Sequence, residues 1–147
     1  MIGNKTVRYY VACKVLLPLL IGGIMYYLFF PEVTFVKTLD SYMPFHYHIC
    51  GIYNNYALVP FLRFYLFDFI WAYSFANMLQ IILLENRVRI LLTYVIALSV
   101  GVQYEFSQLT GLFFGTFDIF DIIAEAIGIT ISMLTTICSR RDKNEKN

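Results

Sequence analysis

Three acidic residues stand in one of the most apolar stretches of this chain. Asp118, Asp121 and Glu125 all occur in the segment GTFDIFDIIAEAIG, residues 115–128. A carboxylate in hydrocarbon is costly, so it normally takes up a proton, pairs with a cation or faces water. On a helix, the three acids share with Gly128 and Ser132 a single arc of roughly 80°. This spacing predicts a polar helix face that binds a proton, a cation or a polar ligand.

Helix capping is the alternative explanation for the first two acids. Either Thr116 or Asp118 can serve as the N-cap, and carboxylates are favoured beside the positive end of a helix. The dipole effect fades within the first turn, whereas Glu125 lies about 10 Å deeper along the helix axis. Glu125 therefore requires another source of stabilisation, either a proton or a nearby cation.

Polar residues from two other segments are expected at the same depth. Glu105 and Gln108 share one helix face if their helix continues three residues beyond Glu105. Arg63 enters from the same side, where it either pairs with one of the acids or extends to lipid phosphate. Asp68 lies about 140° around the helix from Arg63, so these two should not pair within the helix. The predicted ligand-binding site comprises Glu105, Gln108, Asp118, Asp121, Glu125 and Arg63.

The composition indicates what kind of protein must position these residues. Of the 147 residues only 14% are charged, whereas a soluble globular chain has roughly 25%. The low charge and the long apolar runs predict a polytopic membrane protein with the lipid bilayer as its solvent. A formal net charge of +1 argues against a nucleic-acid partner, since such a protein needs a concentrated basic face.

Four apolar runs are long enough to be spans, because crossing the hydrocarbon takes about 20 residues in a helix. They cover residues 11–30, 56–84, 89–105 and 117–138, and a polar tail follows at 139–147. The first run offers no small-residue cleavage site, so we interpret it as a span and not as a signal peptide. Asn77 and Gln80 are expected to form hydrogen bonds between helices. The predicted fold is all-α, a single domain forming an integral membrane four-helix bundle over residues 1–147.

The distribution of basic residues predicts the orientation of these spans. In a four-span arrangement most of the basic residues fall on one side of the membrane. The other side carries only Lys37, with Arg63 near its boundary. The side rich in basic residues is expected to face the cytoplasm. Both termini are then cytoplasmic, the loops at 31–55 and 106–116 are external, and the chain is a multi-pass protein of the cell membrane. The residues on the basic side are Lys5, Arg8, Lys14, Arg87, Arg89, Arg140, Arg141, Lys143 and Lys146.

The first external loop contains the run HYHIC, residues 46–50. Alternation around residues 45–49 is typical of a short strand, although an interfacial segment fits equally well. On a strand, His46, His48 and Cys50 would share one face and present ligands for a soft metal. Three ligands at alternate positions of one strand fit a tetrahedron poorly, so we predict no metal site, and the sequence indicates no particular cofactor.

The stretch EFSQLTGLFFGTFDIFDIIAEAIG, residues 105–128, resembles the motif region of the VanZ-like family of small polytopic bacterial membrane proteins. Two positions differ: Gly115 stands where members often have Arg, and Glu125 stands where they often have Asn. The resemblance implies an association with glycopeptide resistance and a glycopeptide-related ligand, but no defined reaction. The matching residues are Glu105, Gln108, Thr116, Phe117, Asp118, Asp121 and Gly128.

Several functions fit this pattern. The preferred interpretation is an outward-facing acidic site that binds the head group of an envelope lipid or cell-wall precursor. A small proton- or cation-coupled transporter subunit is the first alternative, and it would need to form a homo-oligomer because four short spans supply few groups for a path. An intramembrane metal-dependent enzyme is the second. A packing partner of a larger complex, whose acids only fix the helix register, is the third.

Overall fold

The computed structural model describes residues 4–31, 34–44, 48, 58–83, 87–112 and 116–144, and side chains are described for 7–31, 36–44, 48, 64–83, 90–112 and 116–138. Within these ranges the regular structure is entirely helical. The helices are α1 (Asn4–Val11), the π-helical turn η1 (Ala12–Leu16), α2 (Leu17–Phe29), α3 (Thr34–Tyr42), α4 (Leu58–Leu83), α5 (Arg87–Leu109) and α6 (Ile119–Asn144).

Four helical stretches in the described ranges are long and apolar enough to cross a membrane. This confirms the predicted all-α class with four candidate spans. Large apolar side chains such as Leu20 on α2 and Leu91 on α5 are more than half exposed, as expected for surfaces that face lipid. The stretches are Val7–Phe29, Phe64–Leu83, Ile90–Leu109 and Ile119–Cys138.

The ends of these helices differ from the sequence prediction in physically understandable ways. Helix α5 continues to Leu109, beyond the predicted end at Glu105, and Gly111 then turns the chain with a φ of 72° that glycine adopts readily. Helix α6 begins at Ile119, because Asp118 serves as its cap. Helix α3 occupies the first predicted loop upstream of the expected strand at 45–49, most of which lies outside the described residues.

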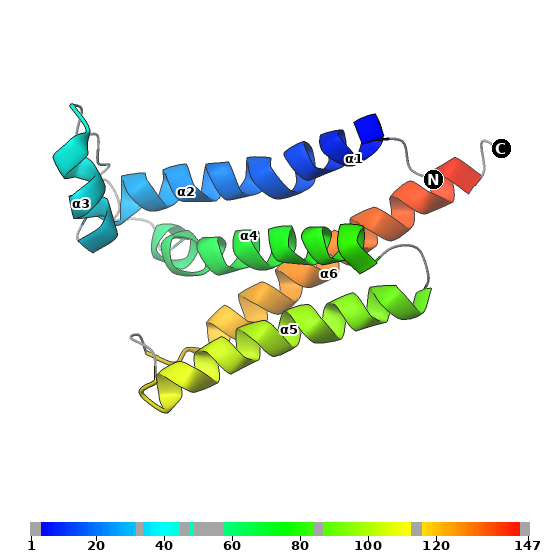
Figure 1. Ribbon diagram of the computed structural model, residues 1–147. Coiled ribbons are helices and arrows are strands. Elements are labelled where there is room, and N and C mark those ends of the chain that lie inside the picture. Colours follow the sequence, from blue (N-terminus) through cyan, green and yellow to red (C-terminus); the bar gives the residue numbers. More distant parts are fainter. Residues whose placement is uncertain are drawn as a thin grey trace.

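Helix α4 is the centre of the arrangement. It packs on α2, α5 and α6, and its interface with α6 is the most extensive. Figure 1 shows α1, η1 and α2 as one nearly continuous rod, with both chain termini at the same end of the molecule and α3 at the opposite end. Gly128 permits the close approach of α6 to α4, since a Cβ at this position would lie 2.5 Å from the Phe69 carbonyl oxygen.

The buried side chains of the bundle are mostly small, and many are polar, as expected where lipid replaces water as solvent. In the half of the bundle near the chain termini, the Tyr10 hydroxyl donates a hydrogen bond to Asn77 Oδ1 at 2.9 Å. The same hydroxyl lies 3.1 Å from Thr136 Oγ1. Gln80 Nε2 donates to Ser132 Oγ at 3.0 Å. These contacts confirm Asn77 and Gln80 as interhelical hydrogen-bonding residues.

Candidate functional site

The N-terminus of α6 is fixed by the first of the three acids. Asp118 Oδ1 accepts a hydrogen bond from the Phe120 backbone N–H at 2.9 Å, which is the usual geometry of an N-cap. Asp118 Oδ2 accepts a bond from the Tyr65 hydroxyl at 3.2 Å. Both carboxylate oxygens are therefore occupied by structural contacts, and of the alternatives for Asp118 the structure supports capping.

Glu105 completes the same capping arrangement from α5. Its Oε2 accepts a hydrogen bond from the Asp118 backbone N–H at 3.0 Å, and the side chain is only 4% exposed. A carboxylate is stabilised at this point because the free N–H groups and the helix dipole both favour negative charge. Glu105 therefore ties the end of α5 to the start of α6.

The same half of the bundle contains a partly open cavity of about 720 Å³. Its lining residues lie on the parts of α2, α4, α5 and α6 that are remote from the chain termini (Figure 1). Acidic side chains come from three of these helices and aromatic rings from α2, α4 and α5. The lining residues are Gly23, Tyr26, Phe30, Phe64, Phe67, Asp68, Trp71, Val100, Tyr104, Glu105, Gln108, Asp121 and Glu125.

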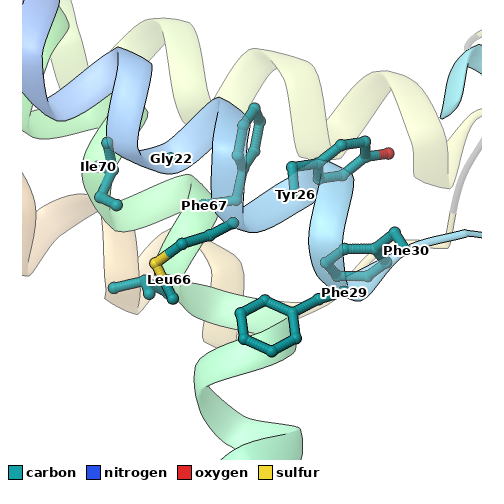
Figure 2. Close-up of a pocket in the computed structure, with 8 residues that line it drawn as sticks. Gly22, Tyr26, Phe29, Phe30, Leu66, Phe67 and Ile70 are labelled. Atoms are coloured by element: carbon teal, nitrogen blue, oxygen red, sulfur yellow. The ribbon is translucent and has the colours of Figure 1, made fainter. Parts of the chain in front are cut away.

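A smaller apolar crevice adjoins this cavity between α2 and α4. Figure 2 shows rings and aliphatic side chains from both helices around this crevice. Its volume is about 20 Å³. Tyr26, Phe30 and Phe67 line both spaces. The aromatic wall of the large cavity is thus continuous with the packed seam between α2 and α4.

Glu125 is the least satisfied group in the cavity. Its side chain is 4% exposed, and its Oε2 atom has no hydrogen-bond partner. The carboxylate occupies space left by Gly101 on α5, because a methyl group added there would overlap it. A buried, unpartnered carboxylate is costly, so this position requires a proton, a cation or a hydrogen-bond donor from outside the chain.

Asp68 and Asp121 form a second acidic element of the cavity. Asp68 extends from α4 and Asp121 from the first turn of α6, and their carboxyl groups lie within hydrogen-bonding reach of each other. Two carboxyl groups can share a hydrogen bond only when one carries a proton. Both also interact electrostatically with Glu105, so the negative charge is concentrated in one place.

The structure brings together most of the predicted site. Glu105, Gln108, Asp121 and Glu125 line one cavity, whereas Asp118 is not among its lining residues. The Arg63 side chain lies outside the described residues, so its predicted pairing stays a prediction. The motif residues Thr116 and Phe117 are exposed just before α6, and Gly128 packs on α4.

Asp68 and the aromatic wall are outside the set predicted from the sequence. Helical spacing shows which residues share a face of one helix, but not which faces of different helices meet. One signal does point to Asp68, because it is the only acid in the apolar run at 56–84. A lone acid in a span is a candidate functional residue for that reason.

Within the HYHIC run, His48 is the residue whose contacts the structure describes. His48 Nε2 lies 2.7 Å from Asp40 Oδ2, and the Tyr27 hydroxyl donates to Asp40 Oδ1 at 2.6 Å. These contacts attach His48 to α3 and α3 to α2. His46 and Cys50 lie outside the described residues, and within the described part of the chain no three His, Cys, Asp or Glu residues are placed to hold a metal ion.

Comparison of the chain with protein-family models, with curated proteins and with solved structures gave no match. The VanZ-like resemblance therefore depends on the motif at residues 105–128 alone and stays a prediction.

Proposed function

We propose that this chain is a VanZ-like multi-pass protein of the cell membrane whose cavity faces outward and holds the polar head of an envelope lipid or cell-wall precursor. The observation that carries the proposal is Glu125, a buried residue whose Oε2 atom has no hydrogen-bond partner and which lines a cavity of about 720 Å³. A cavity of this size with polar groups at one side and apolar walls fits an organic ligand.

The walls of the cavity favour an amphiphile as the ligand. Helices α2 and α5 both contribute lining residues, yet within the described residues they make at most marginal contact with each other. The cavity is partly open, so we infer that a hydrocarbon chain in the bilayer enters it by a path between α2 and α5. Aromatic rings such as Phe64 and Phe67 line this path, and their exposed fractions of 56% and 40% suit contact with acyl chains.

The proposed outward orientation follows from the basic residues. The cavity lies at the end of the bundle away from the termini (Figure 1), and the segments rich in Lys and Arg lie at the terminal end. The positive-inside rule would then direct the cavity outward.

An epitope tag after Asn147 should resist protease added to intact cells and be cleaved after permeabilisation. Cleavage in intact cells would refute this orientation.

Trp71 provides a direct test of ligand binding. It is the single tryptophan of the chain and it lines the cavity, so its fluorescence reports on this site alone. We expect a saturable change in emission when the protein, purified in dodecyl maltoside micelles, is titrated with twelve-carbon amphiphiles that carry charged heads. A response that is small, unsaturable and equal for all heads would overturn the proposal.

A proton-coupled transporter subunit is the second candidate, and the Asp68–Asp121 pair favours it. Two interacting carboxyl groups on neighbouring helices are a common element of proton relays. If this candidate is correct, proteoliposomes should show proton flux that is lost in Asp68→Asn. If the cavity is a head-group site without transport, the amphiphiles should still change Trp71 emission in proteoliposomes, and those proteoliposomes should show no proton flux.

A further inference from the structure

We propose that the head group bound in this cavity carries an organic ammonium ion. This inference rests on the proposed function and specifies the chemistry of its ligand. It is argued from the charge of the lining, from the aromatic wall and from the position of the unpartnered carboxylate.

The charge of the lining selects a cation. Asp68, Glu105, Asp121 and Glu125 all line the cavity, and its described lining includes no basic side chain. Glu105 Oε2 is already engaged by the Asp118 N–H, but Glu125 Oε2 has no partner. A cation beside Glu125 would remove the cost of that buried charge, whereas an anionic head would add to the repulsion.

The wall of the cavity selects an organic cation over a bare metal ion. Trp71, Tyr26 and Tyr104 line the space together with three phenylalanines, and ring faces attract ammonium groups through the ring quadrupole, tryptophan most strongly. A volume of about 720 Å³ accommodates a substituted amine with its hydrocarbon attachments. An ammonium also supplies up to three N–H donors, which suit carboxylates and the Gln108 side-chain oxygen.

The position of Glu125 orients such a ligand. This carboxylate lies one turn deeper in α6 than Asp121, and it fills the gap beside Gly101 on α5. Trp71 is on α4 and stacks on Phe75, with ring centroids 5.3 Å apart, which limits the orientations of its indole. The cation would thus be enclosed between this ring on α4 and a buried carboxylate on α6.

The experiment is a titration of Trp71 emission with dodecylammonium, dodecyl phosphate and ethylammonium, each added to protein in dodecyl maltoside micelles. Glu125→Gln retains the size of the side chain and removes its charge. Asp142→Asn is the charge-matched control, because it lies in the same helix about 25 Å from Glu125 at 1.5 Å per residue. Helical circular dichroism and melting confirm that each variant is folded, and Asp121→Asn provides a second test if Glu125→Gln is not.

We expect dodecylammonium to bind saturably and to lose roughly tenfold to hundredfold in affinity in Glu125→Gln, the range for a charge-assisted hydrogen bond. Asp142→Asn should bind as the wild type does. Ethylammonium should need a much higher concentration because it lacks the hydrocarbon chain.

Three results would overturn parts of this assignment separately. Preference for dodecyl phosphate, lost in Arg63→Gln, would refute the ammonium and leave the proposed head-group function intact. If ethylammonium binds with the same affinity as dodecylammonium, the cation site would stand but an amphiphilic ligand would be refuted. The proposed function would be refuted with it. A melting temperature that Ca²⁺ raises, with no response to either amine, would refute the ammonium in favour of a metal ion.

Discussion

Substitution of Gly128 by alanine tests whether the α4–α6 interface positions the cavity. A Cβ at this position would lie 2.5 Å from the Phe69 carbonyl oxygen and 3.2 Å from the Tyr73 backbone nitrogen. Both neighbours are backbone atoms of α4 and cannot rotate away. The methyl group falls 0.9 Å short of the 3.4 Å at which ordinary contact begins, so the helices must separate by up to about that distance.

The cost of this separation has two parts. Overpacking of a close interface costs about 1–3 kcal/mol. The Gln80–Ser132 hydrogen bond crosses the same interface at 3.0 Å, and its loss adds about 0.6 kcal/mol, the average for such bonds in membrane proteins. Gly23→Ala is the matched control, because a Cβ there meets nothing within 4 Å and the gain in helix propensity is the same.

Thermal melting of the two purified variants, followed by circular dichroism in dodecyl maltoside, measures the difference. Gly128→Ala should be less stable than Gly23→Ala by about 1.6–3.6 kcal/mol, which corresponds to roughly 3–14 °C in Tm for a chain of this size. Equal melting temperatures, or a more stable Gly128→Ala, would show that α4 and α6 do not approach as closely as described. The Trp71 titration would then lose its structural basis.

Three further predictions use the same melting assay. Gly101→Ala should lower the Tm much less in a Glu125→Ala background than in the wild type, because the added methyl overlaps the Glu125 carboxylate; additive effects would contradict that contact. Asp118→Ala should cost about 1 kcal/mol while Asp118→Asn costs little, since asparagine is an equally good N-cap, and equal losses would exclude capping. Tyr10→Phe should lower the free energy of unfolding by about 0.6–1.7 kcal/mol because it leaves Asn77 Oδ1 without its donor. An unchanged Tm would show that this bond does not stabilise the fold.

The helices of this chain are predictable because the bilayer imposes a local rule. A span needs a continuous apolar run of about 20 residues, and such a run can be recognised without knowing its neighbours. The first and fourth runs therefore lie close to the observed stretches Val7–Phe29 and Ile119–Cys138. The end of α5 is harder to predict, because Ser107 and Gln108 look like loop residues although they continue the helix to Leu109.

The cavity is less predictable because it depends on contacts between distant segments. Asp68 and Asp121 are 53 positions apart, and only the packing of α4 on α6 shows that their carboxyl groups meet. The spacing of the acids on one helix predicts a polar face correctly. It cannot show that Asp118 turns back to cap its own helix while Glu125 lines the cavity.

The acids of this chain thus divide by how well the protein itself satisfies them. Asp118 is bonded through both of its carboxylate oxygens, and Glu105 binds the start of α6, so these two stabilise the fold that surrounds the cavity. Glu125 has an oxygen with no partner, and a buried polar atom without a partner lowers the stability of the fold. Proteins retain such local costs mainly where function requires them, because an ideally satisfied residue has nothing left to offer a ligand. The same lack of a partner that makes Glu125 unfavourable for folding makes it the group most able to bind a cation.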